Sequence, residues 1–156
     1  ALESGIPLGM GFVKNRYVGR TFITPDQTSR EQAVRIKLSA LRSEVEGKRI
    51  VMVDDSIVRG TTCSQIINLL REAGATQVHM RVSAPPFIAP CYFGTDIPNK
   101  DKLIACHHSL EEIEAMTGAD SLEYLSLDHL RHLAPDAQCG FCEGCFTQRY
   151  PISVEE

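Results

Sequence analysis

The stretch VMVDDSIVRGTT, from Val51 to Thr62, carries most of the information about the fold. An apolar run ends here in two adjacent carboxylates, Asp54 and Asp55, and leads into a turn of Ser, Arg, Gly and Thr residues. Because neighbouring negative charges repel each other, we expect a cation, a phosphorylated ligand or both beside this pair. The run IVMV before the pair is wholly apolar, which is typical of a parallel strand buried on both faces.

The residues that follow predict a βαβ unit. A helix is expected from Thr62 to Gly74, because apolar residues recur on one of its faces: Ile66, Leu69, Leu70 and Ala73. A second strand is expected from Thr76 to Ser83. A strand, a helix and a strand within about 30 residues form a parallel pair with a right-handed crossover. The sequence therefore predicts an α/β fold.

Two further elements are predicted before this unit. Ile6–Val13 is apolar and indicates a short buried strand. Ser29 and Gln32 form a capping-box pattern, which predicts the start of a helix that ends at Gly47. Apolar residues recur along that helix at helical spacing: Val34, Leu38, Leu41 and Val45.

Composition and charge limit the classes of ligand. The chain has 156 residues, the length of one domain, with 43% hydrophobic and 23% charged residues. Its net charge of -4 indicates no general affinity for nucleic acid. Nine of the 16 basic residues nevertheless fall between Lys14 and Arg49, so this segment is suited to an anionic small molecule.

The sequence shows no sign of a membrane or secretory segment. No apolar run approaches the roughly 20 residues that a membrane span needs, and no signal peptide is readable. The six cysteines therefore favour a reducing compartment, the cytoplasm, and roles in metal binding or catalysis over disulfides.

The turn after the acidic pair has the features of a phosphate site. Gly60 permits backbone geometry that other residues resist, and the start of the next helix supplies free N–H groups. Hydroxyl groups come from Ser56, Thr61 and Thr62. Asp54 and Asp55 could then bind the hydroxyls of an attached sugar, or Mg²⁺. The alternative is that one Asp caps the turn and the other is solvated. We expect a phosphorylated sugar, bound with a metal ion.

VMVDDSIVRGTT resembles the motif with which type I phosphoribosyltransferases bind 5-phosphoribosyl 1-pyrophosphate (PRPP). Four stretches are similar to the family of glutamine PRPP amidotransferases, also called amidophosphoribosyltransferases: KNRYVGRTFI, VRIKLSALRSEVEGKRIVMVDDSIVRGTT, REAGATQVHMRVSAPP and CYFGTDIP. Together they cover nearly the whole chain in the family's order. The resemblance implies a type I phosphoribosyltransferase fold, a parallel sheet with flanking helices.

The resemblance also implies an activity and a set of site residues. The family is a glycosyltransferase that makes 5-phosphoribosylamine, glutamate and pyrophosphate from PRPP, glutamine and water, the first step of de novo purine biosynthesis. Asp54 and Asp55 would hold the ribose hydroxyls and Mg²⁺, and Lys37 would reach the substrate as a catalytic residue. The 5-phosphate would be held by Ser56, Arg59, Gly60, Thr61 and Thr62. Purine nucleotides would act as inhibitors, and the parent protein would be a homo-oligomer, a tetramer.

The basic segment before the motif resembles the family's flexible loop. Arg20 to Arg42 would fold over PRPP and exclude water, with Arg35 and Lys37 facing the substrate. The alternative is that these charges only solvate an amphipathic helix. By the same resemblance, Lys14 would contact a regulatory purine nucleotide.

The cysteines form a second candidate site. Cys139, Cys142 and Cys145 have CxxCxxC spacing, which suits zinc or an iron–sulfur cluster, with a fourth ligand among Cys63, Cys91 and Cys106. The resemblance implies a 4Fe–4S cluster on Cys91, Cys142 and Cys145, with its fourth ligand upstream of this chain. The alternatives are Zn²⁺ on these three together with Cys139, or free thiols.

Two regions and two alternative functions follow. Residues 1–133 are interpreted as the C-terminal part of the phosphoribosyltransferase domain, and they include a predicted helix over 109–117 and an apolar run over 122–127. Residues 134–156 are interpreted as a Cys-rich metal-cluster tail. We expect the N-terminal strands and the glutaminase domain to be missing, which would leave an exposed sheet edge. The alternatives are a non-catalytic PRPP-sensing module and a metal-stabilised structural fragment.

Overall fold

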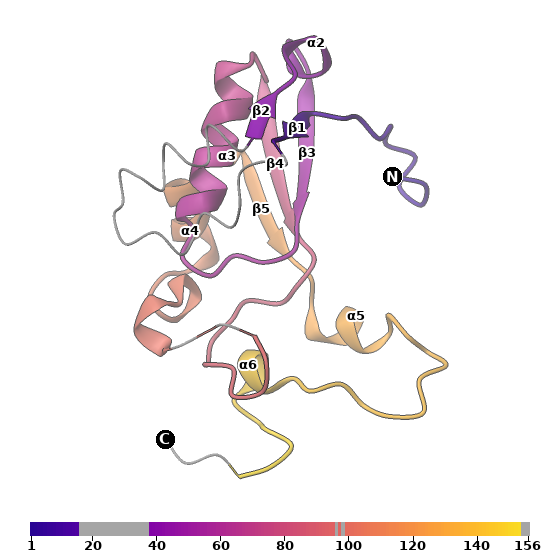
Figure 1. Cartoon of the computed structure of the whole chain (residues 1–156), viewed down its shortest axis with the longest axis vertical. Helices are drawn as coiled ribbons and strands as arrows, with labels where there is room; N and C mark the ends of the chain where they lie inside the picture. Colours follow the sequence, from indigo (N-terminus) through magenta and orange to yellow (C-terminus); the bar gives the residue numbers. More distant parts are fainter. Residues whose placement is uncertain (16–37, 96, 98, 154–156) are drawn as a thin grey trace.

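The centre of the computed structural model, which describes residues 1–15, 38–95, 97 and 99–153, is a three-stranded parallel sheet (Figure 1). Its strands are β3 (Arg49–Asp54), β4 (Gln77–Val82) and β5 (Ser121–Tyr124), with β4 in the middle. Asp54 pairs with Val82, and Val82 with Tyr124, so all three strands end at the same edge. The predicted α/β fold and the parallel βαβ pair are confirmed.

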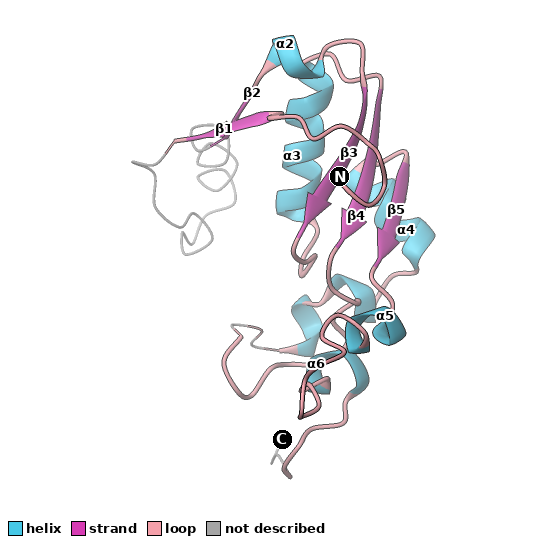
Figure 2. Ribbon diagram, turned by 90° about the vertical axis from the view of Figure 1, so that its right-hand side faces the viewer, coloured by secondary structure: helices cyan, strands magenta, loops and turns pink. Residues whose placement is uncertain are grey.

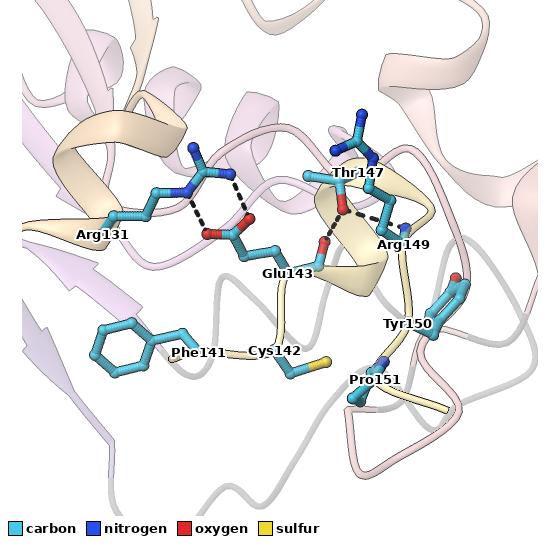
Figure 3. Close-up of a pocket in the computed structure, with 8 residues that line it drawn as sticks. All are labelled: Arg131, Phe141, Cys142, Glu143, Thr147, Arg149, Tyr150 and Pro151. Atoms are coloured by element: carbon cyan, nitrogen blue, oxygen red, sulfur yellow. Dashed lines mark hydrogen bonds and ion pairs between the residues drawn. The ribbon is translucent and has the colours of Figure 1, made fainter. Parts of the chain in front are cut away.

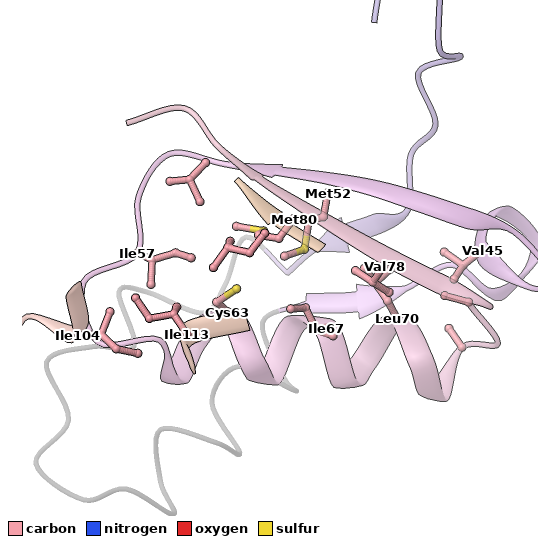
Figure 4. Close-up of a cluster of buried hydrophobic side chains, with 14 residues drawn as sticks. Val45, Met52, Ile57, Cys63, Ile67, Leu70, Val78, Met80, Ile104 and Ile113 are labelled. Atoms are coloured by element: carbon pink, nitrogen blue, oxygen red, sulfur yellow. The ribbon is translucent and has the colours of Figure 1, made fainter. Parts of the chain in front are cut away.

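One face of the sheet is covered by α3 (Thr61–Glu72) and α4 (Leu110–Thr117), as Figure 2 shows. These elements enclose an apolar cluster, which we call the main core (Figure 4). The strands contribute Val78, Met80 and Leu122 to it, and the helices contribute Ile67, Leu70 and Ile113. α3 lies where its periodicity predicts it. α4 begins with a complete capping box between Ser109 and Glu112 and ends at Gly118, which has a φ of 76°.

The other face of β3 differs from the prediction. Met52 is 9% exposed, whereas its neighbours Val51 and Val53 are 41% and 70% exposed. The expectation of burial on both faces is therefore wrong for this chain, because the described helices cover only one side of the sheet. Among the described residues β3 and β5 each pair with β4 alone, so both are edge strands.

The N-terminal elements also differ from the prediction. β1 (Phe12–Lys14) pairs antiparallel with β2 (Leu38–Ala40), and α2 (Arg42–Val45) follows. The helix predicted to run to Gly47 is therefore wrong over Leu38–Ala40, where the chain pairs with β1 instead. Its predicted start at Ser29 lies outside the described residues.

The predicted strand Ile6–Val13 is wrong in most of its length and in its burial. The strand begins only at Phe12, and Ile6, Leu8 and Met10 are 51%, 87% and 71% exposed. Gly11 still joins the pairing, since its carbonyl accepts a hydrogen bond from the Leu41 N–H at 2.9 Å. Phe12 packs against the main core.

Polar contacts tie the sheet to its helices. Asp120, just before β5, accepts hydrogen bonds from the Val78 N–H at 2.6 Å and from Arg71 of α3 at 2.7 Å. These contacts lower the pKa of Asp120, mainly through the Val78 N–H and then through Arg71, and they outweigh the opposing effect of burial. One carboxylate thus connects β4, β5 and α3.

A second set of elements lies beyond the carboxyl ends of the strands (Figure 1). It contains the 3-10 helices η2 (Lys100–Lys102) and η3 (Ile104–Cys106), followed later in the chain by α5 (Leu127–Arg131) and α6 (Gly144–Thr147). A separate apolar cluster, which we call the lower cluster, is formed by Phe87, Ile97 and Leu103. Phe146 and Cys145 of α6 pack against it, so the tail folds back onto the loop after β4.

Candidate functional site

The acidic pair lies where the sequence predicts it, at the carboxyl end of β3. Asp54 is half-buried and accepts a hydrogen bond from the Asp55 N–H at 3.0 Å. Asp55 is exposed and accepts a hydrogen bond from the Ser56 hydroxyl at 2.7 Å. The Asp54 carbonyl accepts from the backbone and the hydroxyl of Ser83, at 2.9 and 3.2 Å. The strand end is thus held in place while the Asp55 carboxylate faces solvent.

The electrostatics of Asp54 favour a cation. Burial raises the pKa of Asp54, the hydrogen bond from the Asp55 N–H lowers it, and the charge of Asp55 raises it again, with a net upward shift. A carboxylate that is disfavoured in this way gains stability when a metal ion or a hydroxyl donor binds it. The pair therefore suits Mg²⁺ or the hydroxyls of a sugar.

The turn from Ser56 to Gly60 leads directly into α3. Gly60 is the N-cap of α3 with a φ of 79°, and it has no side chain with which to cap the helix. The first turn of α3 contains no acidic residue, and Arg59, Thr61 and Thr62 are exposed. The N–H groups of this turn and the hydroxyls around it can therefore receive an anion such as phosphate.

Two titratable side chains that the sequence did not single out for this site lie near it: Cys63 beside Asp54, and Tyr124, at the end of β5, beside Cys63. Cys63, in the first turn of α3, is 3% exposed, and burial followed by the charge of Asp54 raises its pKa to about 12. Burial and then Cys63 raise the pKa of Tyr124 to about 12, and the Tyr124 hydroxyl has no hydrogen-bond partner within the described part of the chain. Both groups stay neutral, so Asp54 and Asp55 carry the negative charge.

Several predicted residues lie away from this arrangement or outside the description. Lys37 and Arg35, together with the basic residues Arg16, Arg20 and Arg30, fall within 16–37, outside the described residues. Lys14 is exposed at the end of β1. The structure thus assembles the predicted pair and turn, while the predicted loop over the substrate stays a prediction.

The cysteine site is partly assembled. Cys91 and Cys145 both pack against the lower cluster, and the Cys145 carbonyl accepts hydrogen bonds from the Ile88 and Ala89 N–H groups at 2.9 and 3.1 Å. The pKa of Cys145 is raised, mainly by burial and then by the charges of Cys91 and Cys142. A backbone hydrogen bond lowers it, but by less than these effects together raise it. Cys91 and Cys142 therefore both lie near Cys145, although Cys142 is exposed, as Cys139 is.

Cys91 has the surroundings of a thiolate ligand. Burial raises its pKa, but the hydrogen bonds from Phe93, Thr95 and Gly94 together have the larger effect, so the pKa is lowered overall. The Thr95 nitrogen lies 3.4 Å from the sulfur. N–H groups directed at a sulfur stabilise its anionic form, which is the form that binds metal. The surroundings of Cys91 are thus those of a ligand to zinc or to an iron–sulfur cluster. Even so, no three His, Cys, Asp or Glu side chains among the described residues are arranged so that they could hold a metal ion.

A shallow pocket of about 190 Å³ opens in the tail beside Cys142 (Figure 3). Arg131 of α5 donates two hydrogen bonds of 2.6 Å each to Glu143, which connects α5 to the start of α6. Tyr150 and Pro151 line the pocket, and the Tyr150 hydroxyl donates to the Pro90 carbonyl at 2.7 Å. The pocket is separate from the acidic pair, and its contacts hold the tail in position.

His107 and His108 are exposed, and Nδ1 of His108 lies 3.6 Å from the Glu112 carboxylate. No helix in the described part of the chain has the length and apolar character to span a bilayer.

Comparisons with known proteins agree with this geometry. The chain is 54% identical over 158 residues to amidophosphoribosyltransferase of Bacillus subtilis, covering 99% of this chain and 33% of that protein. It is 52% identical over 156 residues to amidophosphoribosyltransferase of Archaeoglobus fulgidus, covering 99% of this chain and 34% of the relative. The chain thus spans about a third of the length of these curated relatives. No protein-family model matches it.

Solved structures give the same result. A structure of glutamine PRPP amidotransferase from B. subtilis, complexed with ADP and GMP, superposes with a TM-score of 0.81 and 54% identity, over 98% of this chain and 34% of that chain. A structure described as the allosteric regulatory enzyme of purine biosynthesis superposes with a TM-score of 0.81 and 53% identity, over 97% and 34%.

The parallel sheet, the acidic pair and the turn into α3 define a chain with the type I phosphoribosyltransferase fold. Within that class, the chain matches amidophosphoribosyltransferases over nearly its whole length and corresponds to about a third of theirs.

Proposed function

We propose that this chain carries the PRPP-binding part of an amidophosphoribosyltransferase, which forms 5-phosphoribosylamine from PRPP, glutamine and water. The observation that supports the proposal most strongly is that only a short turn separates Asp54 and Asp55 from the uncapped start of α3. The two negative carboxylates and the positive N-terminus of α3 thus lie next to each other at one edge of the sheet. A sugar phosphate has the complementary arrangement, with hydroxyls at one end and a phosphate at the other.

The proposed roles follow from the chemistry of each group. Asp54 and Asp55 bind the ribose hydroxyls and hold Mg²⁺, which would neutralise charge on the pyrophosphate that leaves. Ser56, Thr61, Thr62 and the N–H groups after Gly60 receive the 5-phosphate, and Arg59 adds positive charge. Loss of pyrophosphate develops positive charge at the ribose, so these residues act by positioning and charge stabilisation rather than as nucleophiles. Lys37 is proposed to reach the substrate from the segment before β2.

We also propose Cys91, Cys142 and Cys145 as ligands of a 4Fe–4S cluster, with zinc on these three and Cys139 as the alternative. The N–H groups around Cys91 and the closeness of Cys145 to the other two sulfurs support this proposal. Ligation would require the three side chains to close up further. Such a cluster would be compatible with a reducing compartment such as the cytoplasm.

Regulation and assembly belong to the same proposal for the whole protein. One structural neighbour is described as complexed with ADP and GMP, and another as an allosteric regulatory enzyme. We propose purine nucleotides as inhibitors of the parent protein, together with a glutaminase domain and assembly into a homo-oligomer, a tetramer.

Calorimetric titration of the chain with PRPP and MgCl₂ tests the PRPP proposal. We expect saturable binding that weakens about 10- to 100-fold in Asp54→Asn and in Asp55→Asn, because each substitution removes a charged acceptor from the site. Asp136→Asn, an exposed carboxylate in the tail, is the matched control and should bind as the wild type does. Equal binding in all variants would show that PRPP does not use this pair.

A further inference from the structure

The turn from Ser56 to Gly60 packs against both apolar clusters, the main core and the lower cluster. Ile57 is 3% exposed and belongs to the main core, between the sheet and the helices. The next residue, Val58, packs against the lower cluster of Phe87, Ile97 and Leu103. Two successive side chains of the turn thus point into two different clusters.

Ile104, in η3, contacts the same turn at two further points. Its N–H donates a hydrogen bond to the Val58 carbonyl at 2.9 Å. Its terminal methyl, Cδ1, lies only 2.8 Å from the place that a Cβ on Gly60 would occupy. Ile104 is 6% exposed and packs in the main core. It therefore fixes a carbonyl in the middle of the turn and fills the space beside its last residue.

These contacts bear on the direction of the N–H groups that follow. Gly60 has a φ of 79°, a conformation that glycine adopts readily, so the turn could rotate at this residue if nothing held it. A side chain packed against the Gly60 Cα restricts that rotation. The N–H groups of the first turn of α3 are then directed outward before any ligand arrives, which reduces the ordering cost of binding.

We infer that Ile104 is a positioning residue for the phosphate-binding turn, acting through Val58 and Gly60 although it lies outside the acidic and phosphate motif. The inference rests on the proposed function only for the identity of the ligand. The contrasting view is that Ile104 is an ordinary core residue, whose loss weakens the whole fold and the turn with it. The two views predict different responses to the loss of a single methyl group.

Ile104→Val removes the Cδ1 methyl that faces Gly60, with little other change. Ile67→Val, in the middle of α3, deletes the same methyl from a residue that is 0% exposed in the same core. Hydrogen–deuterium exchange of the whole chain, followed amide by amide, provides a readout that needs no ligand. We expect the amides of 56–62 to exchange about three- to ten-fold faster in Ile104→Val than in Ile67→Val, the range that one buried methyl supports. Equal exchange in the two variants overturns the inference.

A double-mutant cycle with Gly60→Ala tests the contact itself. In the wild-type background the new Cβ meets Ile104 and is also strained by the positive φ, so PRPP affinity should fall sharply. In the Ile104→Val background the collision is removed, and the same substitution should cost about three- to ten-fold less affinity. Equal losses in both backgrounds would show that Ile104 does not act on Gly60. If the wild-type chain bound no PRPP while the amides of 56–62 still responded, the proposed function would fail and the positioning role would stand.

Discussion

At the scale of single residues, the acidic pair shows how a costly arrangement indicates a ligand. Asp54 is half-buried beside a second carboxylate, and burial is the main reason for its raised pKa. Natural chains retain an arrangement of this kind where a bound cation or donor offsets its cost. The thiol of Cys63, next to Asp54, and the hydroxyl of Tyr124, next to Cys63, are both neutral and add no charge of their own.

Gly144 is a residue whose role is wholly steric. A Cβ at this position would collide with the ring of Tyr150, which packs edge-on against Tyr92 at a centroid distance of 5.1 Å. Gly144→Ala should therefore destabilise the docked tail by about 1–3 kcal/mol, although alanine favours a helix over glycine. Urea denaturation measures the free energy of unfolding.

Gly140→Ala is the control for this substitution, because nothing lies within 4 Å of the Cβ that it would add. It should leave the free energy of unfolding nearly unchanged. A Gly144→Ala chain as stable as the wild type would mean that Tyr150 does not pack against α6 as described.

At the scale of elements, the local sequence predicted α3, α4 and β4, whereas pairing between distant segments decided the N-terminal elements. The spacing of Val34, Leu38, Leu41 and Val45 suits a helix, yet Leu38–Ala40 pairs with Phe12–Lys14. That choice depends on a distant partner, which spacing along one segment does not contain. For the same reason the exposure of Val51 and Val53 could not be read from an apolar run.

The residues of the candidate site also divide into those that the local sequence predicts and those that it does not. Asp54, Asp55 and the turn to Thr62 are contiguous in the sequence and could be predicted from their chemistry. Tyr124 and Ile104 come from distant parts of the sequence and reach this region through packing between elements, which nothing in their local sequence indicates.

The tail provides a test of the proposed metal ligands at this scale. After anaerobic reconstitution with iron and sulfide, we expect Cys91→Ser, Cys142→Ser and Cys145→Ser each to lose most of the bound iron, because serine is a much poorer ligand than a thiolate for such clusters. Metal content per chain, measured by mass spectrometry, is the readout.

Cys106→Ser is the control in this series, since Cys106 packs against the lower cluster and its sulfur is directed at the Ile88 carbonyl, 3.3 Å away. Cys139→Ser distinguishes a 4Fe–4S cluster from zinc. It should leave the iron content unchanged, but it should reduce the zinc content if the bound metal is zinc. Full iron content in Cys91→Ser and Cys142→Ser would exclude the proposed ligand set.

At the scale of the whole molecule, the phosphate-binding turn lies at the junction of two packed regions. The main core holds the sheet against α3 and α4, and the lower cluster holds the tail against the loop after β4. Ile57 and Val58 connect the turn to both regions, so its conformation depends on the packing of each. The turn is thus restrained by side-chain packing on two sides.

The most direct test of the central claim is a nitrogen-15 NMR titration of the chain with PRPP and Mg²⁺. We predict that the largest shift changes fall on the amides of Asp55 to Cys63 and disappear in the Asp54→Asn/Asp55→Asn double variant. Ribose 5-phosphate should shift the amides of the turn, but it should not cause the shifts that come from the pyrophosphate. Shifts centred elsewhere, or none at all from a folded chain, would contradict the assignment of this edge of the sheet as the PRPP site.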